Sequence, residues 1–90
     1  PKLPKIALMI GKVIPEQPAA KAGLLAGDRI VSINAKPIAD WNELVERFRG
    51  RIDQPLQIGV ERHHRLLKFT VKPAAKQDQT GQWHSSIGIQ

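Results

Sequence analysis

The chain has 90 residues and a formal net charge of +6, from 14 Lys and Arg against 8 Asp and Glu. This length supports one domain with one modest core, which excludes a core plus a deep catalytic cleft. Hydrophobic residues at 41% and charged residues at 24% argue against disorder, and the lack of cysteine excludes disulfides and thiolate metal sites. The start at Pro1, without Met, indicates a piece of a longer chain. No apolar run approaches the ~20 residues of a membrane helix.

The first elements predicted are a strand and a short helix. Residues 6–14 are nearly continuously apolar and rich in Ile and Val, which predicts a buried strand with either a bulge or a point of close approach at Gly11. Pro18 suits the first position of a helix, and Gly23 suits the position just past its end. Residues 18–22 are therefore predicted to form one or two helical turns.

Short strands and a turn follow. Gly27-Asp28 predicts a turn, and residues 29–33 predict a strand. Strict alternation would place Val31 and Ile33 on the same face of that strand. Residues 37–38 predict a very short strand that leads into the next helix.

Residues 40–49 give the clearest helix pattern. Asp40 is a favourable N-cap, and Glu43 three residues later resembles a capping box. Glu43 also suits an ion pair with Arg47 one turn along, and Gly50 suits the helix end. One apolar stripe at helical spacing predicts the inward face, formed by Trp41, Leu44, Val45 and Phe48.

The second half predicts a hairpin, a loop and a last extended segment. Alternating apolar residues predict strands over 56–61 and 67–72, joined by a tip at His63-His64. The polar residues 73–84 predict a loop, and residues 87–89 begin the last strand. Helices mixed with strands too short for regular βαβ units imply an α+β domain.

Residue types that often carry catalysis lie in no recognisable motif. They are His63, His64, His84, Ser32, Ser85 and Ser86. The histidines lack metal-ligand spacing, the serines lack a nucleophile motif, and phosphate-binding Gly-rich loops are absent. We therefore expect no catalytic residue, no metal site and no cofactor within these residues.

The positive charge admits more than one interpretation. The densest basic group consists of Arg47, Arg49, Arg51, Arg62, Arg65 and Lys68. No aromatic residue is interleaved on an exposed strand to stack bases, so nucleic acid is not expected as a partner. A solvated basic face is the simplest interpretation, and contact with anionic lipid headgroups is an alternative.

Two features suit peptide binding. Leu44 and Phe48 suit the core, whereas Trp41 and Val45 lie toward the edge of the apolar stripe and suit a groove wall. The segment Ser86-Ile87-Gly88-Ile89 places a glycine between two β-branched residues, where successive backbone N–H groups form a nest for a carboxylate. A strand after that nest would accept an added peptide strand.

Residues 13–34 resemble bacterial PDZ domains. They follow the pattern V-x-P-x-x-P-A-x-x-A-G-L-x-x-G-D-x-I-x-x-I-N, and the resemblance covers about residues 6–89. It implies a circularly permuted PDZ fold, a small, partly open β-barrel or sandwich with two helices. Residues 6–72 would form the core, 73–85 a loop and 86–89 the strand beside the peptide groove. The predicted peptide-binding residues are Ser86, Ile87, Gly88, Ile89, Trp41, Leu44, Val45 and Phe48.

The sequence departs from the usual carboxylate-binding loop, G-Φ-G-Φ. Ser86 replaces its first glycine, and no Arg or Lys lies just upstream, so His84 is the nearest candidate cation. The chain stops at Gln90, which leaves the groove strand short.

Residues 38–41, 60–62 and 87–89 resemble PDZ domains of the bacterial site-2 protease family, most closely the second periplasmic PDZ domain of regulator-of-sigma-E proteases. This implies a periplasmic domain of a larger inner-membrane zinc metalloprotease, whose zinc ligands lie outside this chain. The implied partners are the C-terminal segment of a trimmed transmembrane anti-sigma factor and the neighbouring PDZ and membrane domains. The implied role is to gate substrate access, to bind the trimmed C-terminus, or both. A peptide-binding PDZ domain of a periplasmic serine protease is the alternative.

Overall fold

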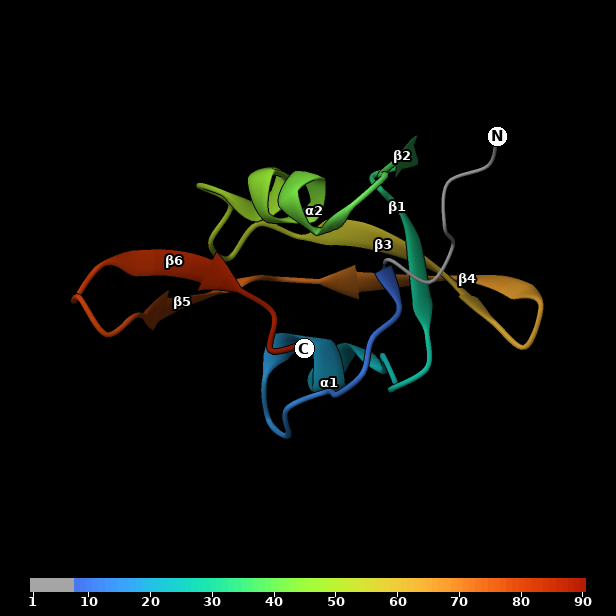
Figure 1. Cartoon of the computed structure of the whole chain (residues 1–90), viewed down its shortest axis with the longest axis horizontal. Helices are drawn as coiled ribbons and strands as arrows, with labels where there is room; N and C mark the ends of the chain where they lie inside the picture. The colour runs from blue at the N-terminus through green and yellow to red at the C-terminus, as the bar shows by residue number, and fades with distance from the viewer. Residues whose placement is uncertain (1–7) are drawn as a thin grey trace.

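The computed structural model describes residues 8–90, which form an α+β fold of two helices and six strands (Figure 1). In chain order these are α1 (Pro18–Ala22), β1 (Arg29–Ile33), β2 (Lys36–Pro37), α2 (Trp41–Phe48), β3 (Leu56–Arg62), β4 (Arg65–Val71), β5 (Ala74–Gln77) and β6 (Trp83–Ser86). An antiparallel sheet has the strand order β2-β1-β3-β4, and β5 pairs with β6 in a separate sheet. Figure 1 shows α1 and α2 on opposite sides of the strands, with the β5–β6 hairpin projecting from one end.

The predicted continuous strand over residues 6–14 is wrong within the described residues, and Ile6 and Ala7 lie outside them. Residues 8–14 make only isolated bridges, one from Met9 to Arg29 and one from Val13 to Ile89. Between the bridges, the N–H groups of Gly11 and Lys12 both donate to the Gln90 carbonyl, at 2.7 and 3.0 Å. Two successive donors on one acceptor are typical of a β-bulge, one of the two features predicted at Gly11, and they interrupt the ladder.

The two helices confirm the predicted capping chemistry. Gly23 ends α1 in the left-handed conformation, with φ of 105°, and its N–H donates to the carbonyls of Ala19 and Ala20. At α2, the Glu43 N–H donates to the Asp40 carboxylate at 2.9 Å, and the Glu43 carboxylate accepts from the Ala39 N–H at 2.7 Å. Leu44 and Phe48 are buried on the inner face.

Simple alternation fails in β1. The register against β3 shifts between Ile30 and Ser32, so that Ile30 and Ile33 are both 1% exposed, while Val31 is only half-buried. The extra residue at the irregularity turns the strand, which brings both isoleucines to the core face. The strict alternation that would place Val31 and Ile33 on the same face is therefore wrong.

The β3–β4 hairpin is confirmed, and its tip has an uncommon composition. His63 and His64 both have positive φ, 51° and 64°, in a two-residue connection between Arg62 and Arg65. Positive φ at both central residues is the geometry of a type I′ turn, which Asn-Gly usually occupies. The ladder between β3 and β4 runs without a break from the pair Leu56–Val71 to the pair Arg62–Arg65 beside this tip.

The predicted loop over residues 73–84 is wrong, because most of it forms the β5–β6 hairpin. The ladder runs from the pair Ala74–Ser86 to the pair Gln77–Trp83. Asp78 organises the tip by accepting hydrogen bonds from the N–H groups of Thr80 and Gln82, at 2.8 and 3.0 Å. The two strands are mostly exposed, and apolar and polar residues do not alternate along them in the sequence.

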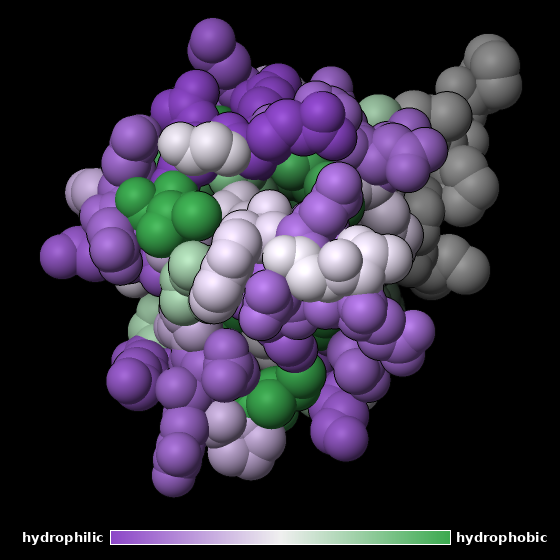
Figure 2. Space-filling view, turned by 90° about the vertical axis from the view of Figure 1, so that its left-hand side faces the viewer, coloured by the Kyte–Doolittle hydropathy of each residue, from purple (hydrophilic) through white to green (hydrophobic). Residues whose placement is uncertain are grey.

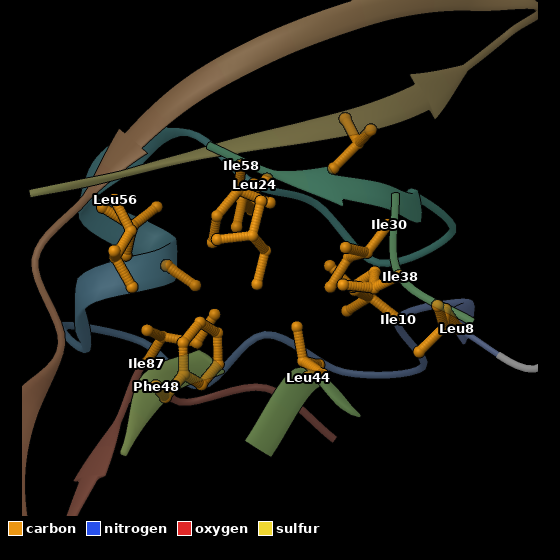
Figure 3. Close-up of a cluster of buried hydrophobic side chains, with 14 residues drawn as sticks. Leu8, Ile10, Leu24, Ile30, Ile38, Leu44, Phe48, Leu56, Ile58 and Ile87 are labelled. Carbon is orange, nitrogen blue, oxygen red and sulfur yellow. The ribbon is translucent and has the colours of Figure 1, made fainter. Parts of the chain in front are cut away.

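The core lies between the four-stranded sheet, α2 and the two terminal segments. Figure 3 shows Leu44 and Phe48 of α2 pointing into the same cluster as Ile58 of β3 and Ile87 near the C-terminus. The buried cluster consists of Leu8, Ile10, Ala19, Leu24, Ile30, Ile33, Ile38, Leu44, Phe48, Leu56, Ile58, Val60, Val71 and Ile87. Because Leu44, Phe48 and Ile87 share this core, the core sets the position of α2 relative to residues 87–90. The candidate site lies between these two segments.

Candidate peptide groove

The C-terminal residues 87–90, here called the groove segment, lie antiparallel to residues 11–14. The Ile14 N–H donates to the Gly88 carbonyl and the Gln90 N–H donates to the Lys12 carbonyl, each at 2.9 Å. A regular strand over residues 86–89 was predicted, and this is wrong. Ser86 ends β6, and Gly88 has a φ of 80°, which interrupts the extended backbone before Ile89 bridges to Val13.

The groove segment has a free edge. Because Gly88 and Gln90 use their backbone groups on residues 11–14, alternation directs the N–H and carbonyl of Ile89 the other way. Neither of those groups, nor the N–H of Ile87 or Gly88, has a hydrogen-bond partner among residues 8–90. The Ile87 carbonyl accepts from the Ala19 N–H at 2.8 Å, which anchors the segment to α1. Three successive N–H donors are thus available beside an open strand edge.

A groove of about 170 Å³ separates α2 from the groove segment, and the predicted site residues all line it. Its lining consists of Trp41, Leu44, Val45, Phe48, Ser85, Ser86, Ile87, Gly88 and Ile89. Sequence reasoning missed Ser85, because it fell within the expected loop and has no motif around it. In the structure the Ser85 hydroxyl donates to the Phe48 carbonyl and ties β6 to the C-terminal end of α2.

The floor and the rim of the groove have different roles. Leu44, Phe48 and Ile87 are 2%, 6% and 2% exposed, so the floor is part of the core. Val45 is 55% exposed and Trp41 is half-buried, so the α2 rim offers apolar surface that the fold itself does not use. This arrangement suits an apolar side chain entering from outside, with its backbone paired to Ile89.

Glycine is required at position 88 both by the positive φ of its backbone and by the close approach of Gln17. A Cβ atom at this position would lie 2.3 Å from the Gln17 Cβ and 2.7 Å from its Cγ. Gln17 is the N-cap residue of α1, so any side chain at position 88 would push the nest away from that helix.

The candidate cation near the loop is already engaged. The Nε2 of His84 lies 2.7 Å from the Asp78 carboxylate. The pKa of Asp78 lies well below its ordinary value, because the Thr80 hydroxyl and then His84 donate to the carboxylate and outweigh the opposing effect of desolvation. Lys76 faces His84 across the β5–β6 ladder.

Among residues 8–90, no group of three or more His, Cys, Asp or Glu side chains is arranged to hold a metal ion. His63 and His64 form the β3–β4 tip, whereas His84 lies on β6. No helix in this described range has the length and apolar character needed to span a bilayer.

Comparison with known proteins identifies related sequences. The family model described as "PDZ domain" matches residues 4–72. The zinc metalloprotease RasP of Geobacillus kaustophilus is 37% identical over 81 residues, which cover 90% of this chain and 19% of that protein. The regulator of sigma-E protease RseP of Escherichia coli is 36% identical over 76 residues, which cover 84% and 17% respectively. The chain thus spans less than a fifth of the length of these relatives.

Solved structures agree on the fold. The PDZ domain of an SdrC-like protein from Listeria monocytogenes superposes with a TM-score of 0.80 at 22% identity, covering 99% of this chain and 90% of that one. The HtrA-type protease AlgW, solved with a decapeptide, gives a TM-score of 0.72 at 27% identity, covering 78% of this chain and 22% of AlgW. The predicted α+β fold and the resemblance to PDZ domains of site-2 proteases are confirmed.

Proposed function

Since the chain belongs to the PDZ domain family, we propose that it is a regulatory, peptide-binding domain of an intramembrane site-2 zinc metalloprotease. The identity of 36–37% to RseP and RasP over most of the chain supports this parentage. In this proposal the domain lies on the periplasmic side of the inner membrane, and the zinc site belongs to other parts of the parent protein. The substrate is a membrane anti-sigma factor that a first protease has trimmed.

The free edge of the groove segment is the observation that carries the binding mechanism. A peptide strand antiparallel to residues 87–90 pairs with the N–H and carbonyl of Ile89. Its C-terminal carboxylate then accepts from the N–H groups of Ile87 and Gly88. Its last side chain contacts the rim at Val45 and Trp41. A contact this small corresponds to micromolar or weaker affinity, at Kd of roughly 1 µM or above.

This mechanism supplies a gate for proteolysis. A trimmed substrate presents a free C-terminus that the groove accepts. An untrimmed substrate carries a bulky folded domain at that point, which the PDZ domain excludes sterically. Binding and exclusion are thus two consequences of placing the same groove in the path of the substrate.

An NMR titration tests the binding step. The 90-residue chain, labelled with ¹⁵N, is titrated with a peptide that ends in a small apolar residue and matches a freshly cut anti-sigma factor. The same peptide with an amidated C-terminus is the control. We expect saturable shifts at Ile87, Gly88 and Val45 that weaken on amidation. Flat spectra with both peptides would eliminate peptide recognition and leave only the steric role.

A periplasmic serine protease is the second candidate for the parent protein. The superposition on AlgW, an HtrA-type protease solved with a decapeptide, favours it. RasP and RseP match at higher identity over more of the chain, which supports the site-2 protease instead. The parent sequence on either side of this domain distinguishes the two, because apolar helices there would point to the membrane protease.

A further inference from the structure

A second hollow of about 370 Å³ adjoins the peptide groove, and it is the larger of the two. The two hollows share Val45, Ser85 and Ser86 as a common wall. The rest of the second lining comes from the β5–β6 hairpin, namely Lys76, Gln77, Asp78 and His84. Figure 2 faces this end of the molecule and shows mainly polar surface with separate apolar patches.

The second hollow lies where a bound chain would continue. A ligand antiparallel to the groove segment runs toward Ser86 in its own N-to-C direction. Its last groove residue therefore sits beside the nest at residues 87–88, and the next residues would pass over Ser86 and Ser85. Those two serines line both hollows, so the groove opens directly into the space beyond.

The charge available in the second hollow is positive. Asp78 is occupied by the hydroxyl and N–H of Thr80, by the N–H of Gln82 and by His84. Lys76, by contrast, is exposed and forms no ion pair within residues 8–90. The side chain best matched to this hollow is therefore an Asp or Glu, beside the free ammonium group of Lys76.

We propose that the groove is open at its carboxylate end and admits a polypeptide that continues past it, with an acidic side chain placed beside Lys76. This inference rests on the proposed function, because it assumes that the groove binds a peptide strand. It extends that function, because the groove then accepts two kinds of ligand. One is a free C-terminus, and the other is a continuing chain segment with an acidic residue just after its apolar anchor. A bare carboxylate would leave most of the second hollow empty.

A peptide series tests the proposal. The 90-residue chain is titrated at low salt with one groove peptide ending at its apolar residue, and with the same peptide extended by Asp-Asp or by Ser-Ser. We expect the Asp-Asp peptide to bind within about tenfold of the unextended one, with shifts at Lys76, Gln77 and His84. We also expect it to bind about threefold more tightly than the Ser-Ser peptide, as suits one exposed ion pair. Lys76→Gln should abolish that threefold preference.

Lys72→Gln is the matched control, because Lys72 is also exposed but lines a different hollow beside α1. It should leave the preference unchanged. If the unextended peptide binds and both extensions abolish binding, the groove is closed and the inference is overturned while the proposed function stands. An acidic preference that survives Lys76→Gln also overturns it. If no peptide in the series binds, the proposed function itself fails and the inference fails with it.

Discussion

Arg62 holds the carboxylate of Asp28 through two hydrogen bonds of 2.7 Å, from Nε to Oδ1 and from Nη2 to Oδ2. Asp28 is 1% exposed and also accepts from the Leu25 N–H at 3.0 Å. The guanidinium group donates further to the Gly23 carbonyl at 3.1 Å and lies 5.2 Å from the centre of the Phe69 ring. One ion pair thus links the end of α1, the turn before β1 and the end of β3.

Asp28→Ala is expected to destabilise the fold by about 2 kcal/mol, because it removes two hydrogen bonds from the Arg62 guanidinium group and the acceptor of the Leu25 N–H. For a domain of this size the melting temperature should fall by about 10 °C. Glu46→Ala is the control, since it removes an exposed ion pair with Arg49 at 3.0 Å. That change should cost about 0.5 kcal/mol at most. Equal losses in the two variants would refute the structural role of Asp28.

The same carboxylate predicts a dependence of stability on pH. Burial alone would raise the pKa of Asp28, but the hydrogen bonds from Arg62 and the Leu25 N–H outweigh it and hold that pKa below its ordinary value. The resulting stabilisation is complete above the unfolded pKa of about 4, and it is lost as the pH falls through the lower folded pKa. Urea unfolding between pH 2 and 7 should show Asp28→Asn converging on the wild type at low pH. A constant difference would contradict this.

Gly88→Ala and Gly50→Ala separate backbone strain from steric clash. Both glycines have positive φ, 80° and 72°, so each substitution should cost about 1 kcal/mol in strain. A Cβ at position 50 meets nothing within 4 Å, whereas at position 88 it meets Gln17 at 2.3 Å. Gly88→Ala should therefore cost about 1–3 kcal/mol more and abolish peptide binding. Chemical denaturation and the peptide titration measure the two effects, and identical behaviour would rule out the clash.

Val45→Lys tests the groove rim without disturbing the core. Val45 is 55% exposed, so the free energy of unfolding should change by no more than about 0.5 kcal/mol. Peptide affinity should fall about tenfold, because a charged side chain replaces the apolar contact. Asn42→Lys, an exposed position elsewhere on α2, adds the same charge and should leave affinity unchanged. If Val45→Lys and Asn42→Lys weaken peptide binding equally, the loss of affinity comes from the added charge and not from the lost apolar contact at the groove rim.

Replacement of His63-His64 by Asn-Gly should stabilise the chain by about 1 kcal/mol. Both histidines have positive φ, 51° and 64°, which strains a side chain with a Cβ atom, whereas Asn-Gly suits a type I′ turn. The change lies at the tip of the β3–β4 ladder, so peptide affinity should stay constant. Thermal unfolding checks the gain, and an unchanged melting temperature would show that the turn carries no strain.

The sequence predicted the elements whose ends are set by nearby residues. The bounds of α1 and β1 were predicted correctly, and those of α2 to within one residue at each end. Asp40 and Glu43 bond to groups at most four residues away, and the left-handed Gly23 bonds to the last turn of its own helix. Such contacts depend on residue type and spacing alone, so they can be inferred from a sequence.

The tertiary structure alone decided the rest. The strands of the β5–β6 hairpin show no apolar alternation, so the turn at Asp78 and the four-pair ladder from Ala74–Ser86 to Gln77–Trp83 define it. Within residues 8–14, Met9 bridges to Arg29 and Val13 bridges to Ile89, and no local sequence pattern predicts this. The groove residues could be named from the sequence, but their meeting depends on Phe48 and Ile87 sharing one core. Contacts between residues so far apart form only when the whole chain packs, because burial of the common apolar surface brings them together.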